Sequence, residues 1–277
     1  MIIWLASYPK SGNTLLRSIL GAYFFSEDGN FDFEHLYKIG QFPSFRFFRD
    51  LNIDITNEKE IYSNYIKAQN LINKNSKSIN FLKTHAALAR LENCNFTNSS
   101  NTLGAIYIVR DPRNVATSFA HHYQLDIDTV VQAMNHENSN LPKNKNLPTT
   151  FISSWSSNYN SWKVLGGRTL LVKYEELTKS KKETLIKIFN FFESLGMKKK
   201  IDIPKLDKII ETTEFTKMQR LEREKKFKES IIDDKTGKKK PFFNLGPNNN
   251  WKKILNEKNI KKIEENFHKE MKELGYL

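Results

Sequence analysis

Residues 7–20 read SYPKSGNTLLRSIL, and they follow the short apolar run Ile-Ile-Trp-Leu-Ala at residues 2–6. This pattern predicts a short buried strand at residues 2–7, and residues 14–25 place apolar side chains at helical spacing. A strand that ends in a tight turn before a helix leaves backbone N–H groups directed outward, and the helix dipole adds partial positive charge there. The stretch therefore predicts an anion site at the turn.

The side chains of this turn suit phosphate or sulfate oxygens. Gly12 lets the backbone approach an anion closely, Ser11 and Thr14 offer hydroxyl donors, and Lys10 offers a mobile positive charge. The turn is not a Walker A motif, because that motif needs a Lys after its last Gly. Taken alone, the stretch fits an ordinary strand-to-helix turn equally well.

A second strand and helix unit lies further along the chain. Residues 104–109 form a β-branched run that predicts a strand, and residues 113–123 predict a helix with Asp111 as its N-cap. Arg110 leaves the strand end and Ser118 lies in the helix, so the two could hold a second phosphate. Taken alone, this unit is explained as well by a salt bridge between Arg110 and Asp111 in a turn.

A third strand is expected at residues 169–174, followed by a Glu-rich turn and a helix from about residue 180 to 195. Strands that alternate with helices predict an α/β fold with a mostly parallel central sheet and helices on both faces. We expect residues 1–277 to form a single domain, with loop insertions near residues 28–60, 135–150 and 228–250.

The composition limits the class of protein. Hydrophobic residues make up 39% of the 277, which is enough for a folded core. The formal net charge of +13 favours an anionic partner, but the lysine runs at 198–200, 225–226 and 238–240 fit solvated surfaces better than a nucleic-acid site. Cys94 is the only cysteine, which excludes an intrachain disulfide and suits a reducing compartment. With no apolar stretch long enough to span a membrane, we expect a cytoplasmic protein.

The two strand and helix units together resemble the sulfotransferases that use 3′-phosphoadenosine 5′-phosphosulfate (PAPS). Residues 8–14 look like the family's 5′-phosphosulfate loop, and residues 109–118 look like its 3′-phosphate segment. Between them, Phe-Leu-Lys-Thr-His at residues 81–85 is similar to the segment that supplies the catalytic base. The resemblance implies a P-loop-like three-layer α/β sandwich, with PAPS as the donor and no metal.

The resemblance also implies residue roles. Tyr174, within residues 173–177, is expected near the adenine, and residues 213–218 are expected to line the adenine pocket. The implied donor-binding residues are Lys10, Ser11, Gly12, Asn13, Thr14, Arg110, Ser118, Tyr174, Thr213, Phe215, Asn244, Leu245 and Gly246. The implied catalytic residues are His85, Lys10 and Lys83.

Two positions depart from the family pattern. Leu15 stands where the family has a Trp that stacks on adenine. Residues 244–251 keep Gly246 and Trp251 but lack the Arg and Lys that hold the 3′-phosphate in relatives. This departure implies either a weaker affinity for the donor than in relatives or a replacement of the missing charge by the nearby lysines at 238–240.

The chemistry of sulfuryl transfer suits the residues present. A neutral His is a suitable general base near neutral pH, which gives that role to His85. Lys10 is placed to stabilise the leaving phosphate oxygen, and Lys83 would steady the sulfuryl oxygens from the same side as His85. The other histidines show no metal-ligand spacing.

Two other functions remain open from the residues. One is a phosphotransferase on a related P-loop scaffold, and the other is a non-catalytic module that binds polyanions through the positive charge. For a sulfotransferase, the acceptor is a hydroxyl or amine of a small molecule, a lipid or a glycan. Six phenylalanines predict an apolar acceptor wall and hence a hydrophobic alcohol, unless they form core under a long loop; they are Phe31, Phe33, Phe42, Phe45, Phe47 and Phe48.

Overall fold

The computed structural model describes residues 1–76, 78–197, 200–225, 227–233 and 236–277. Lys198, Lys199 and Lys226 of the predicted surface lysine runs lie outside the described residues, as do residues 234–235 of the third predicted loop. Within the described part, a parallel five-stranded sheet has the order β2-β3-β1-β6-β9. These strands are β1 (Ile2–Ser7), β2 (Gly40–Gln41), β3 (Asn80–Thr84), β6 (Thr102–Val109) and β9 (Thr169–Lys173).

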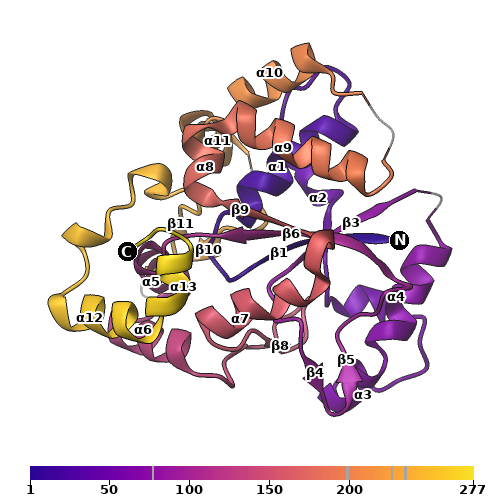
Figure 1. Cartoon of the computed structure of the whole chain (residues 1–277), viewed down its shortest axis with the longest axis horizontal. Helices are drawn as coiled ribbons and strands as arrows, with labels where there is room; N and C mark the ends of the chain where they lie inside the picture. The colour runs from indigo at the N-terminus through magenta and orange to yellow at the C-terminus, as the bar shows by residue number, and fades with distance from the viewer. Residues whose placement is uncertain (77, 198–199, 226, 234–235) are drawn as a thin grey trace.

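Helices cover both faces of this sheet, as Figure 1 shows. One side carries α1 (Asn13–Phe25), α2 (Phe33–Tyr37), α8 (Tyr174–Lys179), α9 (Lys181–Ser194), α10 (Ile203–Thr212) and α11 (Phe215–Glu224). The other carries α4 (Tyr65–Lys74), α5 (Pro112–Tyr123), α6 (Ile127–Asn135), α7 (Trp155–Trp162), α12 (Glu257–Asn266) and α13 (His268–Glu273). The short helix α3 (Glu58–Ser63) precedes α4, and four 3-10 turns complete the helical elements: Phe45–Phe47, Lys163–Arg168, Gly246–Asn248 and Trp251–Lys253.

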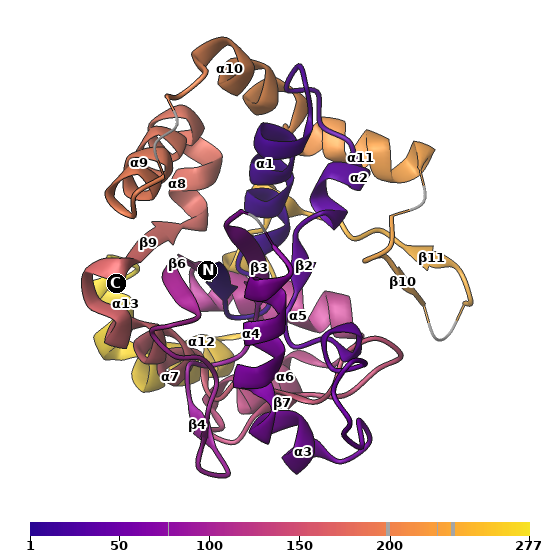
Figure 2. The ribbon, with the colours of Figure 1, turned by 90° about the vertical axis from the view of Figure 1, so that its right-hand side faces the viewer.

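Three small antiparallel pairs lie outside the main sheet. They are β4 (Arg90–Leu91) with β5 (Cys94–Asn95), β7 (Asn140–Leu141) with β8 (Thr150–Phe151), and β10 (Ile231–Ile232) with β11 (Lys239–Lys240). In Figure 2 the pair β10 and β11 lies at one side of the molecule, away from the main sheet.

The central strands divide the core into two halves. Side chains alternate along a strand, so Ile2 and Trp4 of β1 enter one hydrophobic cluster while Ile3 and Leu5 enter the other. All four side chains are fully buried, as expected for a strand covered on both faces. The predicted α/β sandwich with a parallel central sheet is confirmed.

The predicted elements agree with the structure except at one turn. The strand at residues 2–7 and the helices at 14–25 and 113–123 are present, and the Asp111 side chain accepts a hydrogen bond from the N–H of Arg113 as an N-cap. The Glu-rich turn after β9 is instead the helix α8, because Glu175 and Glu176 occupy its first turn, where negative charge is favourable.

Candidate active site

The loop between β1 and α1 is held in an unusual backbone conformation. Lys10 and Gly12 both lie in the left-handed region, with φ of 66° and 106°. Gly12 is also the N-cap of α1 and offers no side chain to its first N–H groups. The buried Ser11 Oγ has no hydrogen-bond partner among the described residues. The loop therefore presents unpaired donors at a helix N-terminus, which is a suitable place for an anion.

The Tyr174 ring closes over this loop and excludes any larger residue at Gly12. A Cβ atom built at Gly12 would lie 2.5 Å from Tyr174 Cδ2. On Tyr174, the Arg110 guanidinium carbon stands 4.3 Å from the ring centroid, a cation–π contact. The glycine, the tyrosine and the arginine thus form one packed stack.

Arg110 joins three separate segments of the chain. Its Nη1 donates to the Lys10 carbonyl oxygen at 3.2 Å, and its Nη2 donates to the Gly246 carbonyl oxygen at 3.1 Å. Its Nε is buried and has no partner among the described residues. Asp111 pairs with Arg113, at 2.8 Å between Oδ2 and Nη2, so the expected alternative of an Arg110–Asp111 salt bridge in the turn is wrong.

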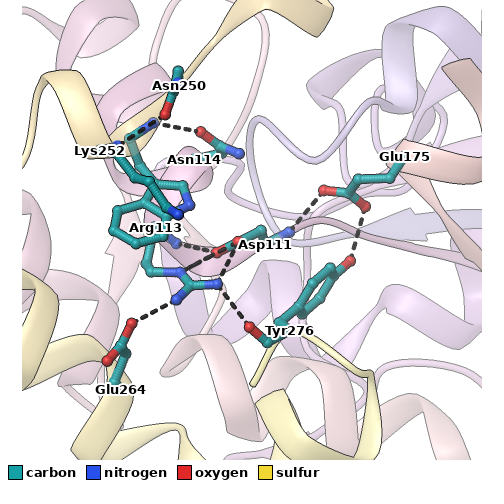
Figure 3. A network of polar contacts seen from close by, with 9 residues as sticks. Asp111, Arg113, Asn114, Glu175, Asn250, Lys252, Glu264 and Tyr276 are labelled. Atoms are coloured by element: carbon teal, nitrogen blue, oxygen red, sulfur yellow. Dashed lines mark hydrogen bonds and ion pairs between the residues drawn. The ribbon is translucent and has the colours of Figure 1, made fainter. Parts of the chain in front are cut away.

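The turn that follows Arg110 is held by hydrogen bonds that involve Glu175 and Tyr276, the latter near the end of the chain (Figure 3). The backbone N–H of Asp111 donates to Glu175 Oε1 at 3.1 Å, and the Tyr276 hydroxyl donates to Glu175 Oε2 at 2.9 Å. Arg113 donates to the Tyr276 carbonyl oxygen at 2.8 Å and lies over the Trp251 ring. Residues near the end of the chain therefore hold the start of α5 in place.

His85 follows the end of β3 and is oriented by two other segments. Its Nδ1 lies 2.9 Å from the Ser7 carbonyl oxygen, and its own carbonyl oxygen accepts from Asn158 Nδ2 at 3.0 Å. A carbonyl oxygen only accepts, so Nδ1 carries the proton and Nε2 keeps its lone pair. Burial, with the positive charges of Lys83 and Lys10, holds the pKa of His85 well below its ordinary value, so the ring is neutral at neutral pH.

The two lysines at the site have weakened proton affinity. Burial lowers the pKa of Lys10 to about 7, with smaller effects of the positive charges on Lys83 and Arg110. Burial also lowers the pKa of Lys83 to about 8. A negatively charged ligand beside these amines would restore their charge.

A cavity of about 1250 Å³ brings the predicted residues together. Of the fifteen positions singled out as catalytic or donor-binding, only Ser11 is not among the lining residues. The lining residues predicted from sequence are Lys10, Gly12, Asn13, Thr14, Lys83, His85, Arg110, Ser118, Tyr174, Thr213, Phe215, Asn244, Leu245 and Gly246. Residues from six separate regions of the chain therefore face one space.

Lys10 has both a catalytic and a donor-binding assignment. Its ammonium group stands 4.0 Å from the centroid of the Phe242 ring, a cation–π contact at the cavity wall. The side chains of Asn13 and Thr213, both predicted to bind the donor, are bonded to the backbone: Asn13 Nδ2 donates to the Leu5 carbonyl oxygen at 2.7 Å, and Thr213 Oγ1 donates to the Ile209 carbonyl oxygen at 2.7 Å. These two side chains shape the site more than they offer free donors to it.

The predicted apolar wall of phenylalanines is wrong. All six are described, and none is among the residues that line the cavity. Phe31, Phe33, Phe42 and Phe48 belong to the two core clusters, and Phe45 and Phe47 pack against one of them. The alternative of a core under a long loop is therefore correct, because these rings pack on the sheet and helices. Other apolar residues line the cavity instead, among them Leu125, Ile127, Leu141, Leu147 and Ile231.

The segment that lacks the usual Arg and Lys is held by polar contacts. Gly246 has a φ of 52°, and a Cβ atom there would lie 2.1 Å from the Phe215 ring. Asn249 exchanges hydrogen bonds with Thr117 at 2.8 and 3.2 Å, and both residues line the cavity. Of the three lysines predicted to replace the lost charge, Lys240 lines the cavity. Lys239 Nζ donates to the carbonyl oxygen of Glu222 at 3.2 Å, so the replacement stays a prediction for Lys240.

Two residues at the site were missed from the sequence. Glu229 reaches into the cavity and accepts hydrogen bonds from Thr14 Oγ1 at 3.1 Å and Arg17 Nη1 at 2.5 Å. Arg17 has the spacing of a buried helix position, and Glu229 stands among lysines in a loop segment. For Glu229, the only signal in the sequence was an acidic residue within a lysine-rich stretch.

Comparisons with known proteins identify the family of this chain. The family model for the sulfotransferase domain matches residues 2–275. The chain therefore belongs to the sulfotransferase family, and the resemblance found in its motifs is confirmed. The curated luciferin sulfotransferase of Photinus pyralis is 25% identical over 280 residues, which cover 95% of this chain and 70% of that protein.

Solved structures share the fold. Mouse sulfotransferase SULT7A1, complexed with PAP, has a TM-score of 0.61 and 21% identity, with 97% of this chain and 83% of that chain covered. Retinol dehydratase, in complex with androsterone and the inactive cofactor PAP, has a TM-score of 0.64 and 18% identity, with 98% and 80% covered. Within the described residues, no helix is long and apolar enough to cross a membrane.

Proposed function

We propose that this protein transfers a sulfuryl group from PAPS to a hydroxyl or amine of a small, largely apolar acceptor, with residues 1–277 acting as one sulfotransferase domain. The observation that carries the proposal is the single cavity lined by His85, Lys83, the Lys10–Thr14 loop and Arg110. Its single cysteine, Cys94, suits a reducing compartment, and the cytoplasm is the proposed location.

The residues present fit a nucleotide that carries two separate anionic groups. The Ser11 hydroxyl and Arg110 Nε are buried without partners among the described residues, and a buried polar atom without a partner is costly. The first lies in the loop at the start of α1, and the second lies beside Gly246. We propose the Lys10–Thr14 loop for the 5′-phosphosulfate, and Arg110 with Ser118 for the 3′-phosphate.

The remaining donor contacts follow the cavity wall. We propose that Tyr174, Thr213 and Phe215 surround the adenine, with Leu15 replacing the family's Trp on the same wall. Residues 244–246 would close over the 3′-phosphate, and Asn13 would support the loop from β1. PAPS supplies an activated sulfuryl group on a phosphate that becomes the leaving group.

The residues at the centre then have separate tasks. His85 accepts the acceptor's proton at Nε2, because Nδ1 is engaged by the Ser7 carbonyl oxygen. Lys83 stabilises the sulfuryl oxygens, and Lys10 stabilises the charge that develops on the leaving phosphate oxygen. In this proposal positioning and electrostatics supply most of the rate, as in phosphoryl transfer.

The acceptor part of the cavity is proposed to bind a hydrophobic alcohol. Apolar side chains from 125–127, 141–148 and 231 line it, and the polar side chains beside them are those of Tyr37, Gln41, Lys143, Asn144 and Asn146. Androsterone occupies one structurally similar protein, retinol dehydratase. An apolar wall supports a compact apolar alcohol over a glycan, whose many hydroxyl groups would need more polar partners.

The test is a calorimetric titration of the purified protein with 3′-phosphoadenosine 5′-phosphate (PAP), beside ADP and beside ATP with magnesium. Tight binding of PAP that weakens strongly without the 3′-phosphate is the expected result. A preference for ATP with magnesium would support a phosphotransferase instead. Transfer of labelled sulfuryl from PAPS to a panel of hydrophobic alcohols and glycans would then identify the acceptor class.

Binding of PAP is expected to weaken as the pH rises from about 6.5 to about 8.5. In the free protein, the lowered pKa values of about 7 for Lys10 and about 8 for Lys83 make both amines lose their protons in this range. The anion raises both pKa values in the complex, so binding takes up protons and full affinity is present only below the free-protein values. We expect a loss of about tenfold or more.

The measurement is the dissociation constant across this pH range, together with the binding heat in two buffers of different ionisation enthalpy. The buffer comparison reports the proton uptake directly. A constant affinity with no proton uptake would show that the lysines stay charged in the free protein.

A further inference from the structure

Glu229 places a carboxylate inside a cavity otherwise suited to anions. Its Oε2 accepts a hydrogen bond from Thr14 Oγ1 at 3.1 Å, and its Oε1 lies 2.5 Å from Arg17 Nη1. Thr14 is in the first turn of α1, whereas Glu229 precedes β10, so the contact joins distant parts of the chain. A hydroxyl that we assign to the donor's phosphosulfate is therefore already bonded to an acid of the protein.

The charges around Glu229 keep it ionised. Burial alone would raise its pKa, but the positive charges of Lys83 and Arg17, with hydrogen bonds from Arg17 and Thr14, hold it far below the usual range. Lys10 also interacts with this carboxylate. In the donor-free protein, Glu229 thus attracts the same groups that the proposed function gives to the donor.

The residues on either side of Glu229, and Arg17, have contacts that do not involve the Glu229 carboxylate. On either side of Glu229, the backbone N–H of Lys228 donates to the Tyr37 hydroxyl at 2.8 Å, and Ser230 Oγ donates to Glu222 Oε1 at 2.6 Å. Arg17 is held separately, because its Nη2 donates to the Ile39 carbonyl oxygen at 2.9 Å. These contacts do not depend on the hydrogen bond between Glu229 and Thr14.

We propose that Glu229 is an exchange residue of the donor site, whose carboxylate holds Thr14 when the nucleotide is absent and yields it when the nucleotide binds. This inference rests on the proposed function. The Thr14 hydroxyl has one proton and can donate to one acceptor at a time. Two anions at the same cations also repel each other. Glu229 therefore weakens donor and product binding and speeds release of the product nucleotide.

The test compares PAP binding by the wild-type protein, Glu229→Gln and Glu229→Asp. Gln keeps the shape and removes the charge, so we expect PAP to bind about tenfold more tightly and to dissociate correspondingly more slowly. Asp keeps the charge that balances Arg17 but is one methylene too short to reach Thr14 and Arg17 together. We expect its affinity to lie between those of the other two proteins.

Glu224→Gln is the matched control. It makes the same change in net charge nearby in the chain, but Glu224 pairs with Arg220 on the exposed surface of α11. Its PAP affinity should equal that of the wild type. Equal or weaker PAP binding by Glu229→Gln and Glu229→Asp would overturn the inference. If Glu229→Gln does not fold, the test is the PAP affinity of Glu229→Asp against that of the wild type, because Asp keeps the negative charge that pairs with Arg17.

The same titrations separate this inference from the proposed function. If the wild-type protein does not bind PAP in a way that needs the 3′-phosphate, the proposed function fails and the inference fails with it. If the wild type binds PAP and the variants bind no more tightly, the donor site stands and only the exchange role of Glu229 is wrong.

Discussion

His85→Ala is expected to remove sulfuryl transfer and to keep PAP binding within about twofold of the wild type, because the proposed function gives His85 the acceptor's proton. His85 is held by the Ser7 carbonyl oxygen at Nδ1, and Nε2 is left as the ring's proton acceptor. Loss of a positioned general base costs about 10²–10⁴-fold in rate. The measurement is single-turnover transfer from labelled PAPS to the best acceptor of the panel, beside PAP calorimetry.

His136→Ala is the control for this experiment. His136 is exposed, and its Nδ1 accepts a hydrogen bond from the N–H of Asn138, so its removal should leave both transfer and PAP binding unchanged. Loss of PAP binding in His85→Ala would assign His85 a structural role. If His85→Ala keeps full transfer, a group other than His85 takes the proton of the acceptor.

Gly12→Ala is expected to reduce PAP affinity at least about tenfold and to lower the free energy of unfolding by about 1–3 kcal/mol. The φ of 106° is strained for any residue with a side chain, and the new Cβ would lie 2.5 Å from Tyr174 Cδ2. Because the Arg110 guanidinium carbon lies 4.3 Å from the centroid of this ring, we expect the clash to disturb the proposed 3′-phosphate side of the site as well. The measurements are PAP calorimetry and denaturant unfolding.

Gly196→Ala separates strain from the clash. Gly196 has a φ of 91°, but a Cβ atom there would meet nothing within 4 Å. Gly196→Ala should lower the free energy of unfolding through backbone strain and leave the affinity for PAP unchanged. Equal loss of affinity in both variants would mean that general destabilisation, and not the Gly12 contact with Tyr174, explains the result.

The sequence predicted the donor loop because its signals are local. An apolar strand, a turn with Gly12 and a helical apolar pattern need only neighbouring residues to be recognised. The same holds for the N-cap at Asp111, whose partner lies two residues away. The Glu-rich turn after β9 was misjudged, because charged residues suit both a turn and the first turn of a helix.

The long-range arrangement needed the structure. Six phenylalanines with the same local pattern could have formed a cavity wall or core, and packing placed them in or against the core. The composition of a loop does not say which face its side chains will contact.

By itself, then, the sequence determined the α/β class, the loop at Lys10–Thr14 and the order of the donor motifs, since each depends on contacts between close neighbours. Only the tertiary structure decided that Arg110 would bond to Gly246, and that Glu229 would reach Thr14, 215 positions earlier in the chain. Such contacts depend on how separate elements pack, and the pattern of neighbouring residues does not contain that information.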